Sequence, residues 1–143
     1  MISKVLIINN GCSGSTGSLS RGLNSYLNEH GINSLFAYAF GNCSDRNSIC
    51  LSNKFHQVAG WLKTKLGCNR YNVGNQPTRK LIQKIRQFNP DIVIVECLND
   101  YSFNLKKLFS YLKKSTIKTF IVNHALFYAT GNCGYPQNGC EKY

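Results

Sequence analysis

Apolar positions along this chain fall into two patterns, short unbroken runs and runs repeated at helical intervals. The unbroken runs predict strands at Lys4–Asn9, Asn33–Tyr38, Asp91–Val95 and Ile117–Asn123. Apolar residues three or four positions apart predict helices at Ser18–His30, Phe55–Leu66, Thr78–Phe88 and Leu105–Leu112. Polar stretches rich in glycine, asparagine and serine predict loops at Gly41–Asn53 and Gly67–Gln76.

The alternation of strands and helices predicts the fold class. Strands separated by helices are typical of an α/β fold with a parallel sheet, because each connection must cross one face of that sheet. The β-branched run at Asp91–Val95 is typical of a strand buried on both faces. We therefore expect a single domain over residues 1–143, a Rossmann-like parallel sheet with helices on both faces. In such sheets, ligands bind beyond the carboxyl ends of the strands.

The first predicted strand leads into a segment rich in glycine and hydroxyl residues, Gly11–Ser20. A loop there, followed by a helix from Ser18, would present backbone N–H groups to an anion. Gly14, Ser15, Thr16 and Gly17 are therefore predicted to bind a phosphate or a sugar phosphate. No acidic residue closes the strand Asn33–Tyr38, which argues against NAD, and no lysine follows Gly17, which argues against a nucleotidase P-loop. The alternative is a plain tight turn between strand and helix.

Other polar residues are expected at the same edge of the sheet. His124 closes the last predicted strand, and Glu96 and Asn99 follow the strand Asp91–Val95. We predict that these three residues bind substrate, and a carboxylate at the position of Glu96 can serve as a general base. The alternatives are a structural histidine and a loop-bracing carboxylate. Asp91 opens its strand at the opposite edge and is expected to be structural. The sequence identifies no catalytic residue and no nucleophile–histidine pair.

The chain is strongly basic, with 17 lysines and arginines against 6 acidic residues and a net charge of +11. Such a charge is typical of a solvated lysine-rich surface, or of attraction to phosphates on a substrate or an anionic membrane. No nucleic-acid-binding motif accompanies it, so nucleic acid is not an expected partner.

The seven cysteines include no C-x-x-C pair, so a metal site is not expected. No signal peptide and no membrane-spanning run is found, so we expect a cytoplasmic protein, peripheral at the inner membrane face at most. In that compartment the cysteines are expected to be reduced thiols rather than a disulfide framework.

Four segments, taken in order, carry a resemblance to a known family. They are Val5–Asn9 followed by Gly14–Gly17, Asn89–Val93, Tyr101–Ser115 and Asn123–Tyr143. Together they cover nearly the whole chain. In this order they resemble the N-terminal domain of family 4-like glycosyltransferases of the GT-B fold, of the kind found in bacterial capsule and exopolysaccharide gene clusters. This chain differs at Ile94, Glu96 and Asn99, where family members often carry histidines, and at Ala125, where they carry aspartate.

The resemblance implies one half of an enzyme that transfers a sugar from a nucleotide-sugar donor to a saccharide or lipid-linked acceptor. In that family the N-terminal domain mainly holds the acceptor, and the fold requires no metal or other cofactor. The glycine segment approaches the phosphate and sugar of the donor, and His124 matches a histidine that touches the donor sugar. The donor-binding domain is missing from these residues, so the resemblance implies a truncated frame or a separate C-terminal chain, with little activity alone.

Two other classes of function remain open. A non-enzymatic binding or remnant domain that pairs with another chain predicts an exposed apolar face. An α/β enzyme complete in itself, flavodoxin-like or phosphatase-like, predicts tight binding of FMN or phosphate at the glycine segment.

Overall fold

The computed structural model describes residues 2–124 and residue 128, and these form an α/β fold around one parallel sheet. The strands are β1 (Lys4–Gly11), β2 (Asn33–Phe40), β3 (Ser48–Cys50), β4 (Ile92–Val95) and β5 (Lys118–Ile121). The helices are α1 (Gly14–Glu29), α2 (Lys54–Lys65), α3 (Asn75–Phe88) and α4 (Leu105–Lys114), with a short 3₁₀ turn, η1 (Arg70–Asn72). The strand order is β3-β2-β1-β4-β5, and every neighbouring pair is parallel.

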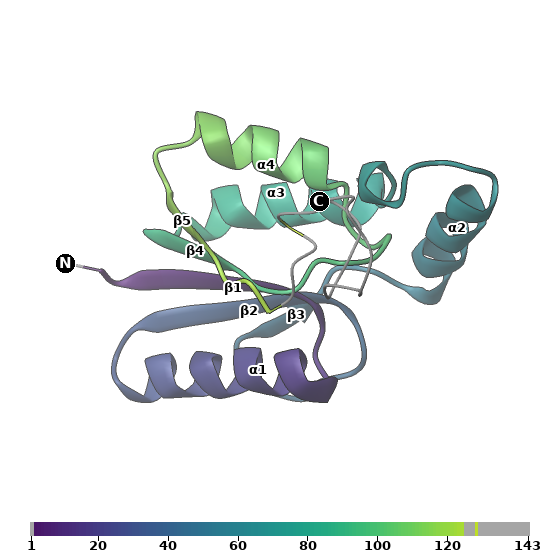
Figure 1. Ribbon diagram of the computed structural model, residues 1–143. Helices are drawn as coiled ribbons and strands as arrows, with labels where there is room; N and C mark the ends of the chain where they lie inside the picture. Colours follow the sequence, from purple (N-terminus) through teal and green to yellow (C-terminus); the bar gives the residue numbers. More distant parts are fainter. Residues whose placement is uncertain (1, 125–127, 129–143) are drawn as a thin grey trace, which may run out of the picture.

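The helices form layers on both faces of the sheet. Helix α1 covers one face, α3 and α4 cover the other, and α2 lies beyond the carboxyl ends of the strands (Figure 1). This arrangement confirms the predicted Rossmann-like parallel sheet with helices on both faces. The helices Ser18–His30, Phe55–Leu66, Thr78–Phe88 and Leu105–Leu112 are each found within four residues of their predicted starts.

The core lies on both sides of β1. Leu6 and Ile8 face α3 and α4, where they pack with Leu81 and Ile85. On the other face, a smaller cluster lies under α1, built mainly from Val5, Ile7, Phe36 and Tyr38. Burying these side chains supplies the main free energy that holds the layers together.

Strand β4 differs from its prediction. Val93 and Val95 are fully buried, whereas Ile92 and Ile94 on the other face are only partly buried. The reason is the position of α1, which packs over β1 and β2. The prediction of a strand buried on both faces is therefore wrong for β4.

Helix α1 also differs from its prediction. Leu19, Leu23, Tyr26 and Leu27 lie at helical intervals that predict one shared apolar face, but Leu19 and Tyr26 are exposed. The side that meets the sheet carries Gly17, Ser20 and Asn24, all of them buried. Polar contacts fix this orientation, because the side chain of Asn24 donates to the carbonyl of Asn47 at 3.2 Å.

Strand β3 lies inside the predicted loop Gly41–Asn53. It has three residues, pairs with β2 alone among the described strands, and has too little apolar sequence to give a strand signal.

The cysteine prediction is corrected at one pair. Cys12 and Cys43 form a disulfide with their Cα atoms 6.3 Å apart, although reduced thiols were expected. The parallel pairing of β1 with β2 brings the carboxyl ends of these strands together, and each cysteine follows one of those ends. Cys50, Cys68 and Cys97 are free thiols, as expected, and Cys133 and Cys140 lie outside the described residues. Within the described part of the chain, every helix is too short or too polar to cross a membrane.

Candidate functional site

The strand order places a topological switch point between β1 and β4. From β1 the chain turns to α1 on one face, and from β4 it continues to α4 on the opposite face (Figure 1). In open α/β sheets, ligands bind outside the carboxyl ends of the strands at such a point. Gly14–Gly17, Glu96, Asn99 and His124 all follow strands that end at this edge.

Helix α1 begins at Gly14, directly after the turn Gly11–Ser13. The predicted loop residues Gly14–Gly17 therefore form the first turn of the helix. The start is earlier than expected because Gly14 adopts φ +76°, a left-handed conformation that glycine allows, and this turns the chain into the helix within two residues of Cys12. The N-cap residue Ser13 makes no side-chain hydrogen bond to the helix, so it does not satisfy the first amides.

The two outer glycines of the predicted motif have different structural roles. Gly14 is exposed, as is Ser15, and both lie at the positive end of the helix dipole. Gly17 is buried, and a Cβ atom there would lie 2.6 Å from the backbone carbon of Cys12. Gly17 therefore allows the helix to pack against the preceding turn, and the amides available to a ligand are those of Gly14, Ser15 and Thr16.

Two asparagines at the end of β1 contact the segments on either side of the switch point. Asn9 is completely buried, and its amide donates to the Gly11 carbonyl at 3.2 Å and to the Thr16 hydroxyl at 3.3 Å. Asn10 points to the loop after β4, where one orientation of its amide donates to Asp100 Oδ1 at 3.3 Å and accepts from the Asn99 backbone at 3.0 Å. Consecutive residues thus fix the start of α1 and the loop after β4.

The structure brings Glu96 and His124 together. Nε2 of His124 contacts Oε2 of Glu96, and both side chains are largely buried, with 23% and 6% of their surfaces exposed. An ionised carboxylate only accepts hydrogen bonds, so Nε2 carries the proton and Nδ1 is left with a lone pair when the ring is neutral. Glu96 therefore sets both the tautomer and the orientation of His124.

Tyr128 supports the same loop from the other side. Its hydroxyl donates to the carbonyl of Glu96 at 2.5 Å and accepts from the backbone N–H of Leu98 at 3.3 Å. Burial raises the pKa of the Tyr128 hydroxyl well above its usual value, so the group stays protonated and remains a donor. Burial also raises the pKa of the neighbouring Cys97 thiol, which disfavours the reactive thiolate.

Sequence reasoning located the edge of the sheet but missed several residues there. Asn10, Tyr128 and the disulfide partners Cys12 and Cys43 were not among the predicted site residues. Asn10 had a detectable signal, because it directly follows an apolar strand that ends at the predicted site. Tyr128 had none, since its distance from Glu96 along the chain says nothing about their contact.

The arrangement suits a ligand with a phosphate and several hydroxyl groups. The amides at the start of α1 suit the anion, and the imidazole, with the amides of Asn10 and Asn99, suits hydroxyls. Within residues 2–124 and 128, no group of three or more histidine, cysteine or acidic side chains could hold a metal ion. The sequence segment after His124 that contributed to the family resemblance lies, apart from Tyr128, outside the described residues.

Comparisons with protein-family models, curated proteins and solved structures find no match to this chain. The residues and their geometry therefore carry the functional argument.

Proposed function

We propose that this domain binds a nucleotide sugar at the switch point between β1 and β4, and that it is the acceptor-side half of a glycosyltransferase in surface polysaccharide synthesis. One observation carries the proposal. A helix start suited to phosphate and a buried Glu96–His124 pair follow strands that end at the same edge of the sheet. A nucleotide sugar offers a diphosphate and sugar hydroxyls in one molecule.

Each group has a defined role in this proposal. The amides of Gly14, Ser15 and Thr16 stabilise phosphate oxygens through hydrogen bonds and the helix dipole. Glu96 holds His124 so that its free nitrogen accepts from a sugar hydroxyl, while Asn10 and Asn99 contact the acceptor. The transfer step needs a second, donor-binding domain, as in the family that the sequence resembles. A lipid-linked acceptor would bring the reaction to a membrane surface.

The test is an amide-resolved NMR titration with UDP-, GDP- and dTDP-sugars, and with FMN and inorganic phosphate as comparisons. At least one nucleotide sugar should shift the amides of Gly14–Thr16 and the ring of His124 saturably, more strongly than FMN or phosphate does. FMN bound more tightly than every nucleotide sugar would favour a flavodoxin-like protein. Rapid sugar transfer by the isolated chain would contradict the need for a second domain.

Two histidine variants distinguish a specific role of His124 from a general effect of removing a histidine. His124→Ala should weaken nucleotide-sugar binding about three- to tenfold, the usual range for one net hydrogen bond. His30→Ala removes an exposed histidine at the end of α1 and should leave binding unchanged. Equal binding by both variants would remove His124 from the site.

A second function is favoured by the uncovered side edge of the sheet at β5. Phe120 and Ile121 of β5 are about half exposed, and β5 is an edge strand in the described sheet. A binding domain that pairs with another chain would present such a surface. Size-exclusion chromatography with light scattering, and affinity capture from the source cells, test this alternative. A monodisperse monomer that captures no partner would count against it.

A further inference from the structure

Helix α2 faces outward with its apolar side. The side chains of Phe55, Val58, Trp61 and Leu62, and of Leu66 just after the helix, are exposed, with Phe55 at 78% and Leu66 at 76%. The opposite side of the helix is buried or half-buried and carries mainly small and polar residues, namely His56, Gln57, Gly60 and Thr64. A helix on the surface of a water-soluble domain normally has the reverse orientation.

Contacts on the polar side hold α2 in this orientation. The amide of Gln57 donates at 3.3 Å to the carbonyl of Ala39, which lies one residue before the end of β2. Gly60 packs against Tyr101, since a Cβ atom at Gly60 would lie 3.0 Å from the ring and 3.2 Å from the backbone oxygen of Tyr101. With its polar side fixed to the body, α2 presents an outer apolar face, which we define as Phe55, Val58, Trp61, Leu62 and Leu66.

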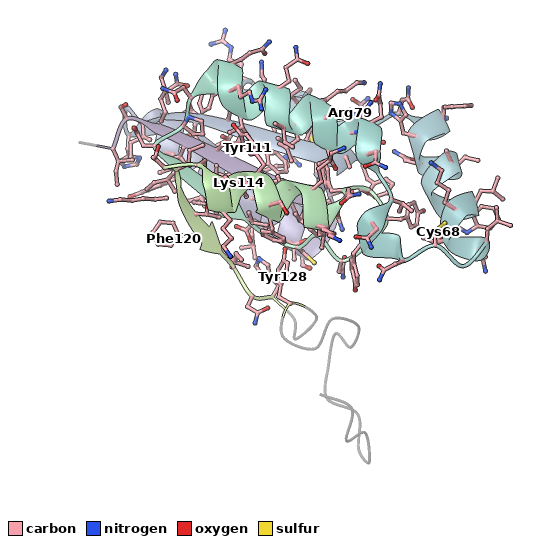
Figure 2. The ribbon with its side chains drawn as sticks, turned by 90° about the horizontal axis from the view of Figure 1, so that it is seen from above. Cys68, Arg79, Tyr111, Lys114, Phe120 and Tyr128 are labelled. Atoms are coloured by element: carbon pink, nitrogen blue, oxygen red, sulfur yellow. A yellow bond between two sulfur atoms is a disulfide. The ribbon has the colours of Figure 1, made fainter. Side chains whose placement is uncertain are left out.

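Basic residues lie beside the outer apolar face and also on the polar side of α2. Lys54, Lys63 and Lys65 lie on α2 itself, and no acidic residue occurs between Asp45 and Asp91 in the sequence. A cavity of about 270 Å³ opens between α2 and the start of α3, and its basic lining residues are Lys63, Arg79 and Lys107. The lining contains no carboxylate. Figure 2 shows Arg79 on the part of α3 nearest α2.

We propose that α2 docks this protein on a membrane surface that contains anionic phospholipid. The outer apolar face enters the interface between headgroups and acyl chains, and Lys54, Lys63 and Lys65 of α2 contact headgroup phosphates. Twelve residues span about 18 Å of helix, so α2 lies in the plane of the interface. Apolar side chains beside lysines and a tryptophan favour this occupant over an apolar protein groove, which offers no anionic partners.

The inference rests on α2 alone and does not require sugar transfer. If both proposals hold, docking through α2 brings the carboxyl ends of the strands toward the membrane, because α2 lies beyond those ends (Figure 1). The two proposals fail separately. Loss of vesicle binding leaves the nucleotide-sugar shifts at Gly14–Thr16 in place, and loss of those shifts leaves vesicle binding in place.

Trp61 is the single tryptophan of the chain and lies on the outer apolar face, so its fluorescence reports docking directly. Vesicles of equal parts phosphatidylglycerol and phosphatidylcholine should shift its emission to shorter wavelength, and brominated acyl chains should quench it. Pure phosphatidylcholine vesicles should give a much smaller shift. High salt should release the protein from the anionic vesicles, because ions screen surface charge.

Matched variants test the apolar and charged parts by vesicle co-sedimentation. Leu62→Glu should weaken binding at least about tenfold, whereas Leu19→Glu, at a leucine on α1 that is also exposed, should not. Lys63→Glu/Lys65→Glu should also weaken binding at least about tenfold. Lys113→Glu/Lys114→Glu is its control, since it makes the same charge change in the last turn of α4 and should have little effect.

Three results would overturn the proposal. One is an unchanged Trp61 emission with anionic vesicles, and another is equal vesicle binding by the test and control variants. The third is a dimer in solution that shields Trp61 and dissociates in Leu62→Glu, which would assign the outer apolar face to contact between two copies of the chain.

Discussion

Three glycines of α1 show how the surroundings of a residue determine the effect of substituting it. Gly14 has φ +76°, Gly17 packs against the backbone of Cys12, and Gly22 has nothing within 4 Å of a Cβ position. Composition treats the three alike, yet only the first two are required by the local structure. Substitution by alanine should therefore have opposite effects within one helix.

Gly17→Ala should lower the free energy of unfolding by about 1–3 kcal/mol, because the added methyl group must displace the turn at Cys12. Gly22→Ala should raise it by about 0.5–1 kcal/mol, since alanine loses less conformational freedom in a helix than glycine does. Urea unfolding of both variants measures the difference. A Gly17→Ala variant as stable as the parent would show that Gly17 does not pack as described.

Asp91 holds the amino end of the sheet at the edge away from the candidate site, which agrees with its predicted structural role. Its carboxylate accepts from the backbone N–H groups of Ser3 at 2.8 Å and Lys4 at 2.9 Å, and from the Ser3 hydroxyl at 3.1 Å. These hydrogen bonds, the Ser3 amide first, hold the pKa of Asp91 below its ordinary value of 3.8.

A lowered pKa in the folded state means that the ionised form of Asp91 stabilises the fold. This contribution is complete above the pKa that Asp91 has in the unfolded chain. It is lost as the pH falls through the lower pKa that Asp91 has in the folded state. Asp91→Asn should therefore be less stable than the parent at neutral pH, and the difference should shrink below about pH 4. Thermal unfolding from pH 2 to 7 tests this, and a difference independent of pH would exclude the charge as its cause.

Among the elements, helical spacing predicted which residues share a face but not what that face meets. The apolar residues Leu81 and Ile85, one turn apart on α3, are buried, yet the apolar side of α2 faces outward. The orientation depends on contacts between distant elements, such as Gly60 with Tyr101, and no local pattern encodes them. The same limit applies at the site, where the strand-end rule located Glu96 and His124 but could not predict their contact.

The disulfide is a link between two elements that can be tested directly. Cys12 and Cys43 are 31 residues apart. A disulfide that closes a loop of this length lowers the conformational entropy of the unfolded chain, which stabilises the fold by about 3–4 kcal/mol. Cys43→Ser should lose stability of this order in denaturant unfolding, while Cys50→Ser, at an exposed free thiol, should lose little. A reducing agent should lower the parent to the level of Cys43→Ser. An unchanged stability in Cys43→Ser would contradict the pairing.

At the scale of the whole molecule, the two ends of the sheet have different characters. The switch point between β1 and β4, the start of α1 and helix α2 all lie at the carboxyl ends of the strands (Figure 1), whereas Asp91 lies at the opposite end. Both proposed contacts, with a nucleotide sugar and with a membrane, therefore fall at one end. The side edge at β5 belongs to neither, and all four residues of that strand are exposed.

Phe120 dominates that edge. It pairs with Ile94 in the parallel register of β4 and β5, and paired residues lie on the same face of a sheet. Helix α1 covers this face only over β1 and β2. Phe120 therefore remains 55% exposed beside the partly buried Ile92 and Ile94. Figure 2 shows Phe120 at the margin of the sheet, to the side of α4. An apolar edge strand of this kind promotes association.

Phe120→Lys should therefore reduce concentration-dependent association while changing the free energy of unfolding by less than about 1 kcal/mol, because the side chain packs little within the domain. Sedimentation equilibrium over a range of protein concentrations measures the association, and urea unfolding measures the stability. Leu19→Lys, at a comparably exposed apolar residue on α1, controls for the added charge and should leave association unchanged. If Phe120→Lys instead lowered stability by several kcal/mol, Phe120 would have to be packed within its own chain, and the free edge would not be an association surface.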